Sequence, residues 1–311
     1  MMKHTETTPD AIRRGVALLT VVLTLIPLTA CASAGTTGMS AQTPMNASTI
    51  ANATLPDHIV NGDFEAYTWR QLTGGQQEPG LGNWTSIDPA TGASYVSSNN
   101  NHWSWKVTDW DNNRFAWAST QVKGASAEQR AGAVELQKED DTNNIYAEIT
   151  AAQAGTAIYQ DINTASDTPV VYRVRLDHAS ISRTWLDKMQ VLVGKPGEEQ
   201  AVPMTRTSSN GNGDQTGETS DVIATTVSNQ PQGCHSDGVI CSARNHKGQW
   251  ETYEGQVTIP AGQQVTRFTF LNKSSSSNNS GNLVDNIVFE KAYPLNYDAN
   301  GGTLTQTPGS K

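Results

Sequence analysis

Charged residues are scarce in this sequence of 311 residues, and the basic ones are the scarcer kind. They make up 16% of the chain, with 21 Lys and Arg against 30 Asp and Glu and a formal net charge of −9. Binding to nucleic acid or to an anionic membrane surface depends on clustered Lys and Arg, so we expect neither as a partner. The charged fraction is also low for a cytosolic enzyme, and solubility must come from neutral polar side chains.

Catalytic motifs are also missing. The sequence contains no H-E-x-x-H, no G-x-S-x-G and no P-loop, and its 6 histidines are scattered without the order of a triad. The acidic run at 139–141 is interpreted as solvated surface. We therefore predict that the protein is not an enzyme. A glycosidase needs only two carboxylates about 5–10 Å apart, and sequence cannot measure that distance, so hydrolysis stays an alternative.

The one long apolar run lies near the N-terminus. Residues 15–30 are apolar, and Lys3, Arg13 and Arg14 precede them. A basic segment before such a run is typical of a secretory signal, and a membrane-spanning helix needs about 20 residues. The sequence therefore predicts export.

The end of this run, Leu-Thr-Ala-Cys, resembles the bacterial lipobox, whose cysteine receives a lipid. We predict a lipoprotein-type signal over 1–31, lipidation of Cys31, and an extracellular protein attached to a bacterial cell surface. Ordinary cleavage after the A-x-A sequence at 32–34, with free secretion, is one alternative. An uncleaved anchor is another.

Cysteine is rare, with 3 in the chain. If Cys31 is lipidated or removed, Cys234 and Cys241 are the remaining partners, with six residues between them in a polar stretch. An exported compartment permits oxidation, and a short loop can bring the two Cα atoms within bonding range, so we predict a disulfide. Free thiols are one alternative. Zinc with His235 and His246 is another, although an adjacent Cys-His pair is awkward for a tetrahedral site.

The composition of the chain after the signal changes at residue 57, which separates a polar segment from a region of predicted strands. Residues 32–56 are small and polar without apolar periodicity, which predicts a flexible tether. From residue 57 short apolar alternations are separated by Gly, Asn, Asp and Ser, and no helical periodicity extends over ten residues. Strands are expected at 58–67, 115–122, 131–137, 144–151, 156–163, 170–179, 188–194, 221–227, 250–259, 264–272 and 283–291. So many short strands predict one β-sandwich domain over 57–293, followed by a tail over 294–311.

Alternation within the strands assigns side chains to faces, because residues two apart share a side. The polar set opposite the apolar one consists of Tyr146, Glu148, Tyr159, Asp161, Arg173 and Arg175. We predict that these side chains form a glycan-binding platform on a concave sheet. The alternative is a solvated sheet with cross-strand charge pairs worth at most about 1 kcal/mol each.

Tryptophan is in local excess, since five of the 8 fall within 34 residues at Trp84, Trp103, Trp105, Trp110 and Trp117. Exposed indoles stack on the apolar faces of sugar rings, and neighbouring Asn and Asp can bind the hydroxyls. We expect Trp84 and Trp117 to lie in the core. Trp103 and Trp105 are predicted to bind sugar, and a plug at the open end of the core is the alternative.

Motifs at the two ends of the sandwich domain resemble a known family. The domain opens with VNGDFE at 60–65 and closes with GNLVDNIVF at 281–289, similar to galactose-binding-like jelly rolls, which include many carbohydrate-binding modules. YAEI at 146–149 and IYQD at 158–161 resemble the jelly-roll domains of Gram-positive surface proteins. The resemblance implies an all-β, jelly-roll β-sandwich fold. The tail, YDANGGT at 297–303, looks like the start of an internalin-type β-grasp repeat, with a plain polar tail as the alternative.

The same resemblance implies a structural calcium ion where the first and last strands meet. Matching residues to the family's pattern gives Glu65 and Asp285, with backbone carbonyls completing the shell. Hard oxygen ligands suit Ca²⁺, and a carboxylate in an apolar strand needs a partner. The alternative is that Asp285 caps a turn or pairs with an arginine. A second oxygen-rich loop, with Asn210, Asn212 and Asp214, lacks EF-hand spacing and is interpreted as solvated.

These observations predict a surface-displayed, non-catalytic carbohydrate-binding or adhesion domain that calcium stabilises. The expected partners are glycans of a host or a cell wall, and the membrane through the lipid anchor. One alternative is a structural spacer without a ligand of its own. A glycoside hydrolase, or an accessory domain of one, is the other.

Overall fold

The computed structural model describes the chain between residues 55 and 293, with gaps. The described residues are 55–75, 84–98, 101–122, 130–139, 144–149, 155–181, 186–211, 213–225, 250–274 and 281–293. They all belong to the unit Ala53–Lys311, whereas the unit Met1–Asn52 lies outside them. Also outside the described residues are the predicted signal at 1–31, almost all of the tether at 32–56, the predicted Cys234–Cys241 disulfide and the tail at 294–311.

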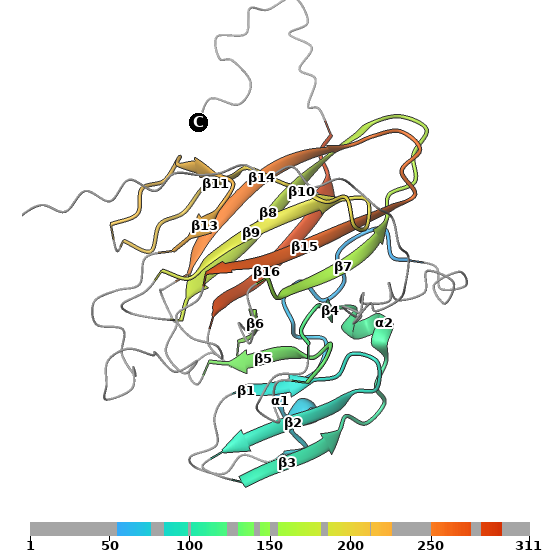
Figure 1. Ribbon diagram of the computed structural model, residues 1–311, viewed down its shortest axis with the longest axis vertical. Helices are drawn as coiled ribbons and strands as arrows, with labels where there is room; N and C mark the ends of the chain where they lie inside the picture. Colours follow the sequence, from blue (N-terminus) through green and yellow to red (C-terminus); the bar gives the residue numbers. More distant parts are fainter. Residues whose placement is uncertain are drawn as a thin grey trace, which may run out of the picture. The chain divides into compact units, whose positions relative to one another are not determined.

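Strands dominate the described part of the chain and form two antiparallel sheets (Figure 1). The larger sheet contains β1 (Trp84–Ile87), β2 (Ala93–Ser98), β3 (Asn101–Lys106), β5 (Val134–Lys138), β6 (Ile145–Ile149), β8 (Val170–Ser180), β11 (Met204–Arg206), β12 (Thr219–Ser220), β14 (Glu251–Ile259) and β16 (Asn282–Lys291). Its strand order is β12-β11-β14-β8-β16-β6-β5-β1-β2-β3. The smaller sheet contains β4 (Ala118–Ser119), β7 (Ala157–Asn163), β9 (Lys188–Gly194), β10 (Gln200–Ala201) and β15 (Val265–Ser274) in the order β10-β9-β15-β7-β4, and β13 (Ile223–Ala224) pairs with β9.

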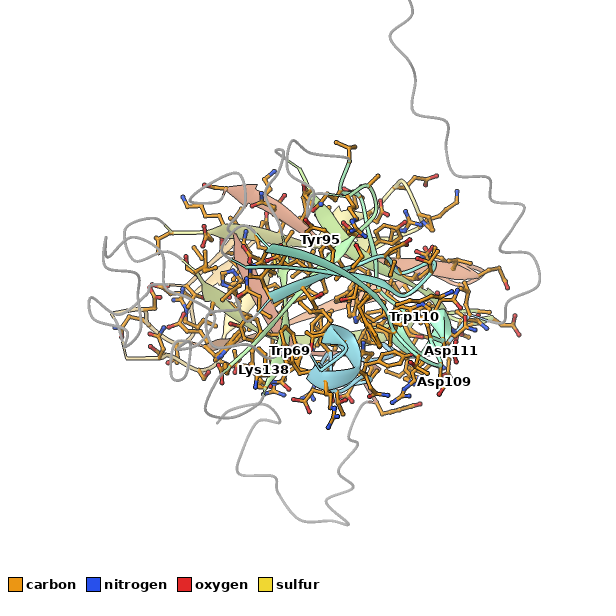
Figure 2. The ribbon with its side chains drawn as sticks, turned by 90° about the horizontal axis from the view of Figure 1, so that it is seen from below. Trp69, Tyr95, Asp109, Trp110, Asp111 and Lys138 are labelled. Carbon is orange, nitrogen blue, oxygen red and sulfur yellow. The ribbon has the colours of Figure 1, made fainter. Side chains whose placement is uncertain are left out.

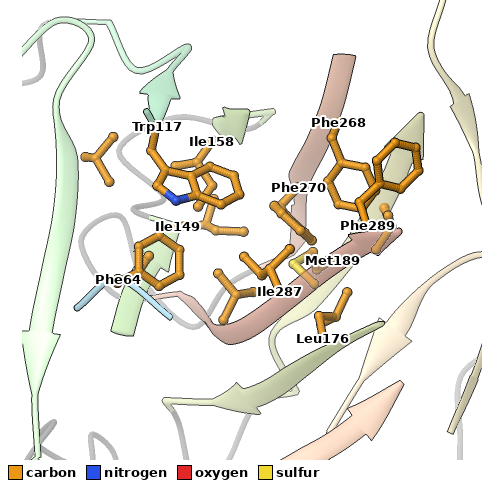
Figure 3. Close-up of a cluster of buried hydrophobic side chains, with 14 of the residues drawn as sticks. Phe64, Trp117, Ile149, Ile158, Leu176, Met189, Phe268, Phe270, Ile287 and Phe289 are labelled. Carbon is orange, nitrogen blue, oxygen red and sulfur yellow. The ribbon is translucent and has the colours of Figure 1, made fainter. Parts of the chain in front are cut away.

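The core lies between the two sheets, and aromatic rings connect them. Phe289 of β16 stacks on Tyr172 of β8, with ring centroids 4.4 Å apart, and lies 5.0 Å from Phe268 of the smaller sheet. Figure 3 shows this end of the cluster and, at its other end, Trp117 beside Phe64, whose ring centroids are 5.2 Å apart. Each buried side chain of this size stabilises the fold by about 1.5–3 kcal/mol. The predicted all-β, jelly-roll β-sandwich class is confirmed.

Strongly alternating segments form strands as predicted, but the segment 58–67 does not. Asn61 and Phe64 have positive φ angles of 55° and 56°, and the Phe64 amide donates to the Asn61 carbonyl, so the backbone turns. The Ile287 amide donates to the Gly62 carbonyl at 2.9 Å, which places this turn against β16. Its apolar side chains therefore enter the core from turns instead of from a paired strand.

The strands β1, β2 and β3 were not predicted, and they extend the larger sheet beyond β5 (Figure 1). The short helix α1 (Trp69–Thr73) packs against them and buries Leu72. A capping box between Thr68 and Gln71 begins the helix, and Gly74 ends it with a φ of 65°. A second short helix, α2 (Asn112–Phe115), follows β3. No helix in the described part of the chain is long and apolar enough to cross a membrane.

Candidate functional site

Trp105 of β3 rests on the turn that ends α1. Its indole Nε1 donates a 3.1 Å hydrogen bond to the carbonyl of Gln71. A Cβ added at Gly74 would lie 2.5 Å from Cδ2 of the indole, so the ring approaches the backbone more closely than any other residue type would allow. The side chain nevertheless remains 40% exposed. The fold therefore holds a tryptophan at a fixed place with much of its surface open.

A hollow of about 260 Å³ lies beside this indole, and we call it the Trp105 hollow. It is lined by Thr68, Arg70, Gln71, Gly74, Trp105 and Thr108. The lining combines one large aromatic surface with hydroxyl, amide and guanidinium groups. That combination can contact the apolar face of a small polar ring and hydrogen-bond its edge.

A second hollow, of about 330 Å³, adjoins the same helix, and we call it the Lys138 hollow. Its walls include Glu65, Thr68, Trp69, Arg70, Lys138 and Ile145. Figure 2 shows Lys138 near Trp69, the first residue of α1. Thr68 and Arg70 line both hollows, so the start of α1 stands between them.

Two other tryptophans near this site, Trp117 and Trp110, are engaged in packing. Trp117 is buried, as predicted, and its Nε1 donates to the Asn61 carbonyl at 2.7 Å. Trp110 stacks on Tyr67, with centroids 4.9 Å apart, and donates to the Pro89 carbonyl at 3.0 Å. Trp84 of β1 is only partly buried and belongs to neither hydrophobic cluster of the described residues, so the prediction that it lies in the core is wrong.

The second predicted sugar-binding tryptophan, Trp103, lies on β3, where its backbone pairs with Val96. Its side chain lies outside the described residues. The assignment of Trp103 to sugar binding therefore stays a prediction.

The predicted polar platform is wrong in its geometry, first because two of its six members are buried. Tyr146 and Glu148 of β6 have almost no exposed surface. Trp250 packs edge-on against Tyr146, with centroids 5.1 Å apart. Glu148 accepts hydrogen bonds from the Gly281 amide at 2.6 Å and from the side chain of Gln137. Other residues pack over β6, and the two side chains that alternation assigns to the surface are therefore buried.

The other four members lie on two different sheets. Tyr159 and Asp161 belong to β7 of the smaller sheet, where Arg267 binds both carboxylate oxygens of Asp161 at 2.7 and 2.8 Å and covers the Tyr159 ring at 4.0 Å. Arg173 and Arg175 belong to β8 of the larger sheet. They pair with two carboxylates of neighbouring strands, Arg173 with Glu290 at 2.7 Å and Arg175 with Glu254 at 3.7 Å. The structure does not bring the six residues together.

Two carboxylates do lie side by side across the strands β5 and β6. Glu135 is the register partner of Glu148. Burial, and then the charge of Glu135, raises the pKa of Glu148 well above its ordinary value. Because Glu148 is buried, the pair does not face an open groove in the described part of the chain, as a glycosidase would require.

The predicted calcium ligands lie in different surroundings. Asp285 is buried and accepts hydrogen bonds from the Asn144 side chain at 2.8 Å and from the Asn286 amide at 2.7 Å. Burial raises the pKa of Asp285 to about 8. Glu65 is exposed and lines the Lys138 hollow.

The donor chemistry at Asp285 fits a hard cation, since a buried carboxylate is stabilised by one. Within the described residues, however, no cluster of three or more His, Cys, Asp or Glu side chains is arranged to hold a metal. A calcium ion here would therefore need backbone oxygens in its shell.

Sequence reasoning missed Thr68, Arg70, Gln71, Gly74 and Lys138. Four of these belong to α1 and its caps, which are too short to show helical periodicity. The available signal was the capping-box pattern, a Thr followed three residues later by Gln, with a Gly just beyond. Lys138 reads as an ordinary surface lysine in the sequence, and only the fold brings it to α1.

Comparison with known proteins gives distant likenesses only. No family model matches the chain, and no curated protein matches it, so the resemblances to galactose-binding-like jelly rolls and to internalin repeats gain no support from sequence. Among solved structures, the K3 cleaved adhesin domain of Lys-gingipain from Porphyromonas gingivalis is 13% identical, with a TM-score of 0.29 over 75% of this chain and 99% of that one.

In two further structures the match to this chain covers a smaller share of the solved structure's length. The CBM22-1–GH10 modules of xylanase 10B from Clostridium thermocellum, complexed with xylohexaose, are 11% identical, with a TM-score of 0.22 over 60% of this chain and 28% of that one. Tailspike protein 4 of bacteriophage CBA120 is 11% identical, with a TM-score of 0.28 over 57% of this chain and 19% of that one. At such identities and TM-scores these likenesses carry no argument about function, and the fold assignment rests on the strand pairing itself.

Proposed function

We propose that this protein is a non-catalytic carbohydrate-binding or adhesion protein whose binding site is the Trp105 hollow. The observation that carries the proposal is the exposed indole of Trp105, which Gln71 and Gly74 hold in place. A ring that is already immobile loses little conformational freedom when a ligand stacks on it, so binding is favoured. Sugars are the ligands that combine an apolar ring face with a hydroxylated edge.

The groups around the indole suit the edge of a sugar. Thr68 and Thr108 supply hydroxyl groups, Gln71 supplies an amide, and Arg70 supplies a guanidinium with several donors. The volume of about 260 Å³ is slightly below the range of about 300–1,000 Å³ for drug-sized ligands, which suits one sugar ring.

Export and anchoring belong to the same proposal. The predicted signal and the lipid on Cys31 would place the domain outside the cell, where glycans of a host or a cell wall are available. Mass spectrometry of the mature N-terminus should find a diacylglyceryl group on Cys31. An unmodified protein that begins at Gly35 would show free secretion instead.

Calcium is proposed as a structural ion, with Asp285 as the central ligand and Glu65 as the second carboxylate of the prediction. Its support is the burial of Asp285 beside the turn that contains Gly62. When bound, the ion would neutralise the buried carboxylate.

The test is a glycan array probed with the wild-type protein and with variants. Trp105→Ala should abolish binding to every glycan that the wild type binds, and Trp103→Ala tests the second predicted residue. Tyr293→Ala is the matched control, because Tyr293 is an aromatic side chain that is 81% exposed and lines neither hollow. If the wild type binds no glycan, or if Trp105→Ala binds as the wild type does, the proposal is wrong. A complete lack of binding would favour the structural-spacer alternative.

A further inference from the structure

The two hollows beside α1 adjoin one another, since Thr68 and Arg70 line both. Each has room for about one small ring, at 260 and 330 Å³. A chain of linked sugars that occupies the Trp105 hollow can therefore continue past Arg70 into the Lys138 hollow. The second hollow offers a neighbouring unit of the same ligand its own contacts.

The Lys138 hollow differs from the Trp105 hollow in its charge. Arg70 and Lys138 contribute two positive charges to it, and Glu65 contributes one negative charge. Two of the three charged side chains in its lining are therefore cationic, whereas the protein as a whole carries a net charge of −9. A ligand group that carries negative charge would be attracted to these two cations.

The positions of the two cations indicate the kind of anion. Arg70 is exposed, and within the described residues no ion pair or side-chain hydrogen bond engages its guanidinium. Lys138 is only 8% exposed and still lines the hollow, so its charge is screened little by water. A guanidinium presents a planar fork of donors that matches the two oxygens of a carboxylate.

The apolar part of the Lys138 hollow suits a sugar ring that carries the anion. Trp69 and Ile145 contribute apolar surface to its lining. The ring of Tyr67 is already covered, by Trp110 on stacking and by the Arg114 guanidinium at 4.6 Å. Glu65 can accept a hydrogen bond from a sugar hydroxyl and would repel a carboxylate on its own side. These groups orient a carboxylate toward Arg70 and Lys138.

We propose that the glycan bound by this protein contains uronic acid, whose carboxylate binds Arg70 and Lys138 in the Lys138 hollow while a neighbouring sugar stacks on Trp105. This inference rests on the proposed function and adds the chemical class of the ligand. Binding should weaken as ionic strength rises, because an exposed cation contributes to it.

Affinity electrophoresis tests the inference with three uronate polymers, polygalacturonate, alginate and hyaluronan, each beside its carboxyl-reduced form. Reduction removes the charge and keeps the linkage and the other hydroxyl groups. At least one acidic polymer should retard the protein, with an affinity about tenfold or more above that of its reduced form, since hydrogen bonds to charged groups are worth about 1.5–3 kcal/mol.

Variants separate the two hollows. Arg70→Gln should lower the affinity for the acidic polymer about tenfold and lower that for the reduced form by much less, because the reduced form lacks the charge that the guanidinium binds. Lys195→Gln removes one exposed positive charge from a loop pair with Glu198 and should behave as the wild type. Trp105→Ala should weaken binding to both forms.

Equal retardation by the acidic and reduced forms would overturn the inference, and so would equal effects of Arg70→Gln and Lys195→Gln. Retardation by none of the acidic polymers would also overturn it. If neutral glycans still bind through Trp105 in those cases, the proposed function stands without the acidic ligand. If no polymer and no array glycan binds, both fail.

Discussion

The indole Nε1 of Trp105 donates a hydrogen bond to the backbone carbonyl of Gln71, and this bond joins β3 to α1. The two residues are 34 positions apart, so the contact fixes the end of a strand against a helix that precedes it in the chain. Without it, an exposed tryptophan on a polar strand would sample several rotamers. The bond therefore determines where the aromatic surface points, and Gly74 determines how closely it lies on the turn.

Gly74→Ala should release Trp105, and Gly75→Ala is its matched control. Both glycines have positive φ angles, 65° and 74°, so each substitution strains the backbone by about 1–3 kcal/mol. Only at Gly74 would the new Cβ collide with the indole, whereas at Gly75 its nearest neighbour is Arg70 Nε at 3.5 Å. Gly74→Ala should shift the tryptophan fluorescence maximum and lose glycan binding. Equal fluorescence and binding in the two variants would mean that Gly74 does not position Trp105.

Acid should destabilise the protein through His178. This residue is fully buried, with Nδ1 2.7 Å from Thr225 Oγ1 and Nε2 2.9 Å from Asn282 Oδ1. Burial, opposed by the bond to Asn282 and aided by the charge of Arg206, lowers the pKa of His178 from 6.5 to about 4. The unfolded chain therefore binds a proton more readily than the folded one. The stability that neutral His178 contributes is complete above pH 6.5 and is lost as the pH falls toward 4, by about 3 kcal/mol.

Urea denaturation between pH 7 and pH 4 measures this effect. Other groups titrate in the same range, so the quantity to compare is the difference between wild type and His178→Asn. His58→Asn is the control, because His58 is exposed and, within the described residues, pairs only with the adjacent Asp57. The free energy of unfolding should fall less steeply with acid in His178→Asn than in the other two proteins. Parallel pH profiles in all three would contradict the prediction.

Two ion pairs on the larger sheet should differ in their contribution to stability. Arg206 and Glu251 are both buried, and their charged atoms are 2.7 Å apart. Arg173 and Glu290 are also 2.7 Å apart, but their side chains are about half exposed, at 43% and 53%. Glu251→Gln leaves a buried cation with one partner fewer and should lower the free energy of unfolding by about 3–5 kcal/mol. Glu290→Gln should lower the free energy of unfolding by less than about 1 kcal/mol. Denaturation measures both variants, and similar losses of stability would show that burial does not distinguish the two pairs.

The strands that the sequence predicts correctly are those with one strictly apolar face. Segments such as 170–179 and 188–194 alternate because one side enters the core, and they match β8 and β9 closely. The strands β1 to β3 carry Ser, Asn and His between their aromatic residues and extend past the main core. Their stability comes from pairing and from α1, which leaves little hydrophobic pattern. The alternation of Trp103, Ser104 and Trp105 was the remaining signal of a strand.

The candidate site could be predicted only in part. Alternation tells on which face of a strand a side chain lies, but it does not tell to which sheet the strand belongs. Arg173 and Asp161 are both polar positions of predicted strands, yet β8 and β7 belong to different sheets. Burial of Glu148 depends on distant residues such as Trp250 that pack over its strand. Trp105 was predicted from its residue type and polar neighbours. Its partners on α1 could not be, since contacts between segments more than 30 residues apart leave no local pattern.

Calcium should stabilise the protein through Asp285, and chelation measures that. If the ion is present at about 100 times its dissociation constant, it adds about 2.7 kcal/mol to the free energy of unfolding. For a domain of this size that corresponds to about 5–10 °C in Tm, which EDTA should remove. Asp285→Asn should have a lowered Tm that EDTA does not change, whereas Asp221→Asn, at an exposed aspartate, should respond as the wild type does.

A wild-type Tm that is indifferent to EDTA would remove calcium from the proposal. In that case the bond from the Asn286 amide to Asp285 supports the alternative in which this aspartate caps its own turn. The cap and the ion differ in one measurement, because a capping carboxylate stabilises the fold equally with and without calcium. Asp285→Asn would then lower Tm by the same amount in EDTA and in calcium, while loss of a bound ion lowers it mainly in calcium.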